Sequence, residues 1–295
     1  MTCTWTNRTF FTEYVNTQLR GDQNALGRMY RPVRNGVTVK GGAINVSIVD
    51  IENMSTSAVA CGEFMSETGN CNTSASLTMS NRKISKCFLP CEWEDLDSEP
   101  TAMRRFVAAQ AAVLAGYFMD LIYVDMIANG TASPQPMGAV PTGATIALAI
   151  LSCLSEIWAR DLPGKITIVV RAADFALWVQ AVGAAFQPFS SMISPMQPNS
   201  AYRGEYMGAA VFITPTALVT ADATPIVVGG VVFHEMGYAW VSGGGGVNGN
   251  ALGAILGFIP EDASPSGGTV YEYLSGCFGY GLLDDEMVYY LDYNA

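Results

Sequence analysis

The chain contains 295 residues, of which half are apolar and only 14% are charged, and its formal net charge is −11. This length can hold one large domain or two modest ones around a sizeable core, and the 15 lysines and arginines argue against a surface that tracks nucleic-acid phosphates. Because a soluble monomer needs polar surface, the low charge and the 30 glycines favour a subunit covered by other subunits or a secreted β-rich protein.

The N-terminal region, residues 1–36, mixes Thr, Asn, Arg and aromatic residues and is predicted to be an extended arm with a short helix around 12–19. It lacks the basic segment followed by an apolar stretch that marks a secretory signal, so we expect none. The seven cysteines are an odd number and do not indicate a secreted disulfide framework. A secreted surface protein is therefore the weaker of the two classes.

A long two-stranded projection is predicted after the arm. Residues 37–51 alternate in part between apolar and polar side chains, which is typical of a strand. A middle rich in Ser, Thr, Asn and Gly places the hairpin tip near 68–71, and the return strand is predicted over 74–89. Because a two-stranded ribbon is marginally stable in water, we expect neighbouring copies of the chain to cover the projection.

An acidic turn over 91–100 leads into a long apolar helix predicted over 101–128, whose positive N-terminal end the acidic residues suit. At about 1.5 Å per residue this helix is roughly 40 Å long. Residues 106–124 have the length of a membrane span, but Gln110, Asp120 and the flanking charges scatter around the whole circumference. We therefore expect a helix that other protein buries, and no membrane association.

The remainder of the chain has an α/β pattern, predicted from apolar spacing and from Gly and Pro punctuation. After a linker over 129–143, helices are predicted over 144–160 and 172–186, strands over 166–170, 209–214, 225–233, 238–242, 270–274 and 287–293, and loops over 187–200 and 243–246. Cys153 falls on the apolar side of the first helix and is predicted to be a core residue.

His234 is the only histidine of the chain. A zinc-protease helix needs a second histidine four residues later, where this chain has Tyr238. One histidine cannot complete a His-rich metal site, and nothing marks the partners of a catalytic triad. We therefore expect His234 to be packed or solvent-facing at a strand end. We also expect no catalytic, cofactor-binding or metal-binding residues, no cofactor and no enzymatic activity.

Four cysteines gather in or beside the projection: Cys61, Cys71, Cys87 and Cys91. They are interpreted first as small apolar residues in β structure. The second interpretation is a disulfide, within or between subunits, that forms after release from a reducing cytosol. The spacing of Cys87 and Cys91 is also permissible for zinc, but Cys61 and Cys71 provide no second pair of ligands, so zinc ranks last.

The order of these elements resembles that of the HK97-type major capsid proteins of tailed bacteriophages. Three stretches resemble local motifs of that family: Ile166 to Ala173 a strand followed by a helix, Arg203 to Ile213 a glycine-bearing turn into a strand, and Pro225 to Phe233 the next strand. The resemblance implies an α+β fold of four parts. They are an N-terminal arm over 1–40, a long β-hairpin called the E-loop over 41–92, a peripheral domain with a spine helix over 93–142 and 269–295, and an α/β axial domain over 143–268.

The resemblance implies a structural protein that self-assembles, through hexamers and pentamers, into an icosahedral shell. We expect such a shell to be located in the virion after assembly in the host cytoplasm, to enclose double-stranded DNA without sequence-specific binding, and to have a portal as partner. Because no helical, charged segment precedes the arm, we expect scaffolding or decoration to come from a separate protein. An encapsulin-like compartment is a close alternative, since its fold is similar and only the cargo differs.

Overall fold

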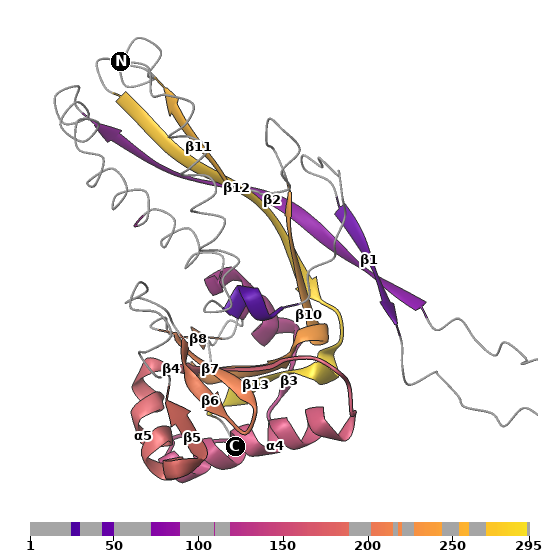
Figure 1. The fold of residues 1–295 in the computed structure, drawn as a ribbon, viewed down its shortest axis with the longest axis vertical. Coiled ribbons are helices and arrows are strands. Elements are labelled where there is room, and N and C mark those ends of the chain that lie inside the picture. Colours follow the sequence, from indigo (N-terminus) through magenta and orange to yellow (C-terminus); the bar gives the residue numbers. More distant parts are fainter. Residues whose placement is uncertain are drawn as a thin grey trace, which may run out of the picture.

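A computed structural model gives the fold and describes residues 25–29, 43–49, 72–88, 109, 119–188, 202–214, 218–219, 227–243, 254–259 and 270–293. The described strands form two sheets (Figure 1). The larger sheet has eight strands in the order β3-β13-β9-β4-β7-β6-β5, with β8 paired to β9. The smaller sheet has five, in the order β1-β2-β12-β10, with β11 paired to β12. The protein therefore mixes helices and strands, as its sequence predicts.

The larger sheet is built around two apolar strands. Its members are β3 (Thr131–Ala132), β4 (Ile166–Arg171), β5 (Phe186–Pro188), β6 (Tyr202–Tyr206), β7 (Ala209–Thr214), β8 (Leu218–Val219), β9 (Val227–His234) and β13 (Val288–Asp292). β4 runs parallel to β7 and antiparallel to β9, and β9 pairs antiparallel with β13. The centre of β4 and nearly all of β9 are buried, as expected for strands covered on both faces.

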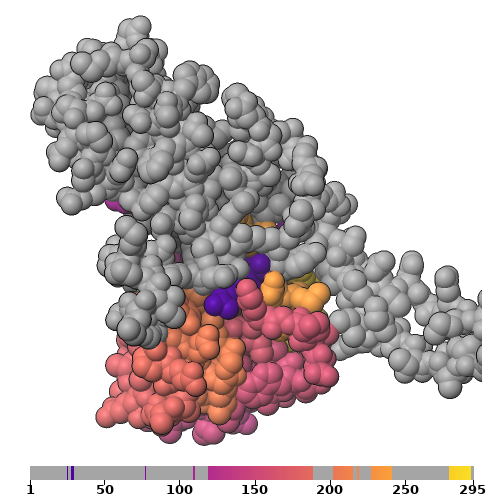
Figure 2. All heavy atoms as spheres, viewed as in Figure 1, coloured from indigo at the N-terminus to yellow at the C-terminus, as the bar shows by residue number. Residues whose placement is uncertain are grey.

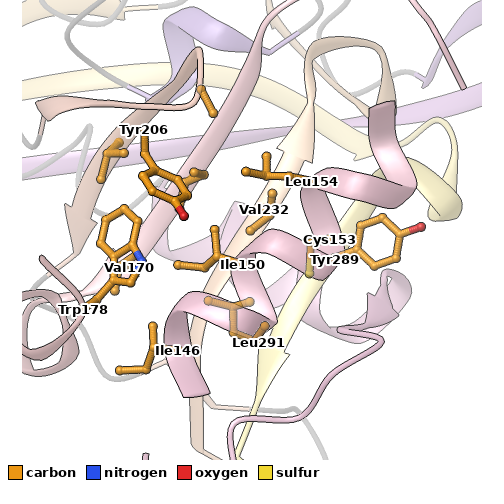
Figure 3. Close-up of a cluster of buried hydrophobic side chains, with 14 of the residues drawn as sticks. Ile146, Ile150, Cys153, Leu154, Val170, Trp178, Tyr206, Val232, Tyr289 and Leu291 are labelled. Atoms are coloured by element: carbon orange, nitrogen blue, oxygen red, sulfur yellow. The ribbon is translucent and has the colours of Figure 1, made fainter. Parts of the chain in front are cut away.

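β4 sends side chains to both faces of this sheet, because alternate residues of a strand point in opposite directions. Ile168 and Val170 belong to the core on the face covered by α4 (Gly143–Ala159) and α5 (Ala172–Val182), which Figure 3 shows from the side of α4. Val169 belongs to the core on the opposite face, which the helical residues 119–129 and the 3-10 turn η1 (Ala25–Arg28) cover. The larger sheet is thus the middle of three layers.

Local chemistry sets the ends of the two helices that the sequence predicts. α4 begins after Thr142, whose hydroxyl accepts from the backbone of Thr145, while the Thr145 hydroxyl accepts from the backbone of Thr142. α5 ends at Val182, before the predicted residue 186, because Gly183 takes a left-handed backbone with φ 55°. The chain then forms a 3-10 turn, η2 (Gly183–Ala185), and the short strand β5, which the predicted loop over 187–200 did not include.

The smaller sheet confirms the two strands of the predicted hairpin but corrects its extent. β1 (Ala43–Val49) pairs antiparallel with β2 (Asn72–Phe88), and the predicted tip near 68–71 lies outside the described residues. From Thr78 onward, β2 pairs with β12 (Val270–Leu282). The prediction of a projection with only two strands was therefore wrong for this half of β2. β12 was predicted to end at 274, because its glycine-rich second half lacks clean alternation of apolar and polar residues.

The other predicted elements have mixed outcomes. The strand over 238–242 is confirmed as β10 (Tyr238–Gly243), whereas β11 (Ala254–Ile259) was not predicted. The long helix is confirmed at residue 109 and at 119–129 only, since its other residues lie outside the described ranges, as do residues 1–24 and 244–250. The two C-terminal strands join different sheets, β12 the smaller and β13 the larger. Within the described part of the chain, no helix is long and apolar enough to cross a membrane.

Candidate assembly surfaces

β2 is a single long strand that changes its partner halfway. Residues 72–78 pair with β1, residues 78–88 pair with β12, and Thr78 lies opposite both Ala43 and Tyr280. With 17 residues at about 3.3 Å each, the strand is roughly 55 Å long, whereas strands of globular proteins usually have about five or six residues. The strand carries β1 away from the three-layered body, as Figure 1 shows.

β12 is the strand to which the second half of β2 is hydrogen-bonded. β2 pairs with it from Val270 to Tyr280. On its other edge, β11 pairs with 271–276 and β10 with 277–282. Because β12 is hydrogen-bonded on both edges along nearly its whole length, it is a central strand, and the smaller sheet is more than a marginal two-stranded ribbon.

The outer edges of this sheet are its candidate surface for assembly. Among the described strands, none pairs with the far edge of β1, and none pairs with residues 79–88 of β2 on the edge that faces away from β12. An exposed strand edge presents backbone N–H and C=O groups that can pair with a strand of another chain. These two edges can therefore receive a segment of a neighbouring molecule.

A small apolar cluster around Leu77 holds the middle of β2 against β10. Leu77 is fully buried, and it packs with Ala239 of β10 and with Leu283. Gly281 of β12 leaves the necessary room, since a Cβ atom there would lie 2.8 Å from Cδ2 of Leu77. The side chain thus sits where β2 passes from β1 to β12.

Two polar contacts, one partly buried and one buried, hold the layers together, and the sequence patterns indicated neither. Tyr238, at the start of β10, donates a hydrogen bond of 2.7 Å to Asp125, and burial raises the pKa of both groups. Tyr293, after β13, donates to the buried Asp174 of α5, which also accepts from Arg171 at 3.1 and 3.3 Å. The Arg171 guanidinium lies 5.1 Å from the centre of the Tyr293 ring. Both sets join segments distant in sequence and are structural contacts.

His234 is packed, which confirms one of the two expected environments. Its side chain is buried at the end of β9, and Nδ1 accepts a hydrogen bond of 3.2 Å from the backbone N–H of Met236. The ring lies so close to Gly164 that a Cβ atom there would be 2.6 Å from the ring carbon Cε1. Burial lowers the pKa of His234, and the neighbouring carboxylate of Glu235 opposes this shift. Within the described ranges, no group of three or more His, Cys, Asp and Glu residues could hold a metal ion.

The structure does not bring together the cysteines singled out in the sequence. Cys61, Cys71 and Cys91 lie outside the described residues, and Cys87 is placed only by its backbone, opposite Tyr271 in β12. Their roles as packing residues or disulfides stay predictions. Cys153 is buried in the core between α4 and the sheet, as predicted, and burial raises the pKa of its thiol to about 12.

No protein-family model matches the chain, and no curated protein matches it in sequence. Solved structures match it in fold. The capsid structure of cyanophage P-SCSP1u matches with a TM-score of 0.55 and 15% identity, covering 90% of this chain and 86% of that chain. The mature capsid of bacteriophage PhiM1 matches with a TM-score of 0.51 and 15% identity, covering 88% of this chain and 89% of that chain. The virus-like particle from Pyrococcus furiosus matches with a TM-score of 0.53 and 10% identity, covering 97% of this chain and 96% of that chain. The resemblance to phage capsid proteins is therefore confirmed at the level of the fold.

Proposed function

We propose that this chain is the structural subunit of a closed protein shell, and specifically a major capsid protein of a tailed bacteriophage with no enzymatic role. The observation that supports this proposal best is the extent of the fold similarity. With the capsid structure of cyanophage P-SCSP1u it covers 90% of this chain and 86% of that chain, and with the mature capsid of bacteriophage PhiM1 88% of this chain and 89% of that chain. The shared fold accounts for nearly the whole chain, so the simplest function is one exercised by the fold as a whole.

In this proposal the four predicted parts have separate roles. The arm (1–40) and the E-loop (41–92) reach neighbouring subunits, and the peripheral domain (93–142 and 269–295) contains the spine helix. The axial domain (143–268) surrounds the axis of each hexamer or pentamer. Pairing of β1 with β2 supports a hairpin in the second part, and the edges of these strands to which no other described strand pairs provide the means by which one subunit clamps the next.

The charge of the chain suits a container better than a nucleic-acid-binding protein. With a net charge of −11, the shell wall repels double-stranded DNA and encloses it without sequence-specific contacts. We propose that a portal and a separate scaffolding or decoration protein complete the particle. The assembled protein then resides in the virion, after assembly in the host cytoplasm.

An encapsulin-like compartment is the second candidate. It is favoured by the match to the virus-like particle from Pyrococcus furiosus, which covers 97% of this chain. The two candidates share the architecture and differ in what the shell contains.

Analytical ultracentrifugation and negative-stain electron microscopy of the expressed protein test the proposal. We expect closed particles of many subunits, formed by the chain alone or with co-expressed scaffolding protein. Nuclease-protected double-stranded DNA in particles from the native host identifies a phage capsid, whereas a protein cargo identifies a compartment. A folded protein that stays strictly monomeric under all of these conditions would contradict both candidates.

A further inference from the structure

Helix α4 is apolar on two opposite sides, although only one of them faces the core. Its inner side is buried against the larger sheet and comprises Ile146, Ala149, Ile150, Cys153, Leu154 and Ile157. On its outer side, Leu148, Leu151 and Trp158 are 59%, 37% and 43% exposed. At about 100° per residue these three side chains fall within an arc of about 80°. A helix that is apolar all round is normally buried all round.

The arc of Leu148, Leu151 and Trp158 contains no ionisable side chain of α4. Glu156 is the only charged residue in α4. It is exposed, but at about 100° per residue it lies about 80° around the helix from Leu148, on the side away from Leu151 and Trp158. Arg160, just after the helix, forms ion pairs with Asp284 and Glu286. The arc that holds Leu148, Leu151 and Trp158 is therefore free of charged side chains of α4, in a chain whose net charge is −11.

The neighbouring helix α5 packs beside the start of α4 and has exposed apolar positions of its own. Gly143, at the start of α4, lies against the backbone of Leu177, where a Cβ atom would be 2.2 Å from the carbonyl oxygen of Leu177. Leu177 is itself exposed, and the exposed positions around it are mostly alanine. The only charged residue of α5, Asp174, is buried beneath Arg171 and Tyr293. We call the outward faces of α4 and α5 the outer helix surface.

The outer helix surface lies at the end of the molecule opposite the smaller sheet, as Figure 1 shows. In Figure 2, atoms of residues 143–188 form the lower surface of the molecule. At about 1.5 Å per residue and a spacing of 8–10 Å, two helices of 17 and 11 residues present roughly 400 Å². A stable interface buries about 800 Å² on each partner, so this surface is large enough to form part of an assembly contact but not an independent dimer.

We propose that the outer helix surface is buried against a second copy of this chain, with Leu148, Leu151 and Trp158 as its apolar anchors. The inference rests on the proposed shell function, which places identical copies side by side. Two copies of net charge −11 repel each other, so a contact between them is least opposed where the facing side chains are apolar and uncharged. At the arc of Leu148, Leu151 and Trp158 they can approach without burying an unpaired carboxylate of α4. This contact is separate from the strand edges of the projection, which lie at the other end of the molecule.

Charged substitutions test whether the surface drives assembly. In the full-length protein, Leu151→Glu and Trp158→Glu each place a carboxylate inside the proposed contact. Both positions are exposed to solvent in the single chain, so the substitutions should not disturb its fold. Met207→Glu is the matched control, because Met207 is 51% exposed on the turn between β6 and β7, outside both helices. We expect all three variants to keep the wild-type circular dichroism and a cooperative melt. We expect the assembled fraction to fall at least tenfold in the two α4 variants and to stay at the wild-type level in the control.

Cross-linking identifies the occupant without depending on those variants. A photo-reactive amino acid at position 148 is incorporated into particles assembled from equal amounts of ¹⁴N- and ¹⁵N-labelled protein. We expect cross-linked peptide pairs of mixed isotope, since these arise only between two copies. Pairs within one copy, or with a different protein, would overturn the inference. The inference would also be overturned if both α4 variants assembled to the wild-type level, or if Met207→Glu lowered the assembled fraction as much as they do. A wild-type protein that forms no particles at all would count against the shell function itself, whereas these outcomes in an assembling protein reject only the contact.

Discussion

The hydroxyl of Tyr238 donates a hydrogen bond of 2.7 Å to the carboxylate of Asp125. Tyr238 opens β10 of the smaller sheet, whereas Asp125 belongs to the helical residues 119–129 that cover the larger sheet. The bond therefore ties the helix to the junction of the two sheets. Asn129 donates a further bond of 3.0 Å to the same carboxylate, so both of its oxygens are engaged.

Removal of the Asp125 carboxylate is expected to destabilise the fold. Asp125→Ala leaves the buried Tyr238 hydroxyl without this acceptor, which costs about 1–3 kcal/mol in the free energy of unfolding. Asp125→Asn is the matched control, because it retains an oxygen that can accept from Tyr238. Urea denaturation followed by circular dichroism measures the difference. Equal stability of the alanine and asparagine variants would mean that the hydrogen bond contributes little.

The pH dependence of the same pair has a defined sign. Burial raises the pKa of Asp125 in the folded protein, so the fold favours the protonated carboxyl and loses stability as pH rises through that pKa. Asp125→Asn removes this contribution. We therefore expect the difference in stability between wild type and Asp125→Asn to shift in favour of the wild type as the pH is lowered towards the ordinary value of Asp, about 4.

His234 is expected to make the protein sensitive to mild acid. Burial lowers its pKa in the fold, so the unfolded chain takes up the proton first, and stability falls as the pH drops below the ordinary histidine value of about 6.5. Since the chain has no other histidine, the effect can be assigned without ambiguity. His234→Asn keeps an acceptor for the Met236 N–H and should flatten the stability profile between pH 7 and pH 5. Parallel profiles of the two proteins would exclude this role for His234.

Leu77 is expected to anchor the extended strands to the body. Leu77→Ala should cost about 2–5 kcal/mol in the free energy of unfolding because it empties a fully buried site. Val140→Ala, at a position that is 84% exposed, should change stability by less than about 0.5 kcal/mol. Gly281→Ala inserts a methyl group against Leu77 and should also destabilise the protein, but less so when Leu77 is already alanine. Additive effects in this double-mutant cycle would show that the two residues do not interact.

The sequence predicts local structure well, and α4 illustrates why. Its start depends on Thr142 and Thr145, and its inner face follows the 3.6-residue period of a helix. Both the start and the buried face therefore depend on residues close together in the sequence. The helical pattern also contained the signal for the outer helix surface, since apolar residues recur on the side of Leu148 as well as on that of Ile146. Only the observed exposure separates the two sides.

Contacts between distant segments could not be predicted in the same way. Tyr293 and Asp174 meet because β13 inserts beside β9, and nothing near either residue encodes that pairing. The full length of β12 is likewise determined by β2 and β10, which supply the hydrogen bonds that its glycine-rich half needs. The family resemblance supplied the overall fold where local patterns could not.

The cysteines of the projection provide a test in assembled particles. If Cys61, Cys71, Cys87 or Cys91 form disulfides after release from the cell, electrophoresis without reductant will show bands that shift on reduction. Cys61→Ser or Cys87→Ser should then lower the heat resistance of the particle, by about 2–4 kcal/mol per subunit for a closed loop of this size. Cys153→Ala is the control, because its buried thiol should not change the band pattern. Migration that is unaffected by reductant would leave these cysteines as packing residues.

The segment between β1 and β2 should be needed for assembly and dispensable for folding. Val49 and Asn72 form the last pair of the β1–β2 ladder, so a two-residue Asn-Gly turn in place of residues 50–71 can close the hairpin directly. This replacement keeps Leu77 and the pairing of Thr78 to Phe88 with β12, both of which the fold requires. We expect unchanged circular dichroism, a cooperative melt and no closed particles. A second variant, in which 50–71 is a Gly-Ser linker of the same length, separates the reach of the segment from its side chains. If the short-turn variant builds normal particles, the segment is not an intersubunit clamp and the E-loop assignment is wrong; if it does not fold, the segment belongs to the core and the proposed domain map is wrong.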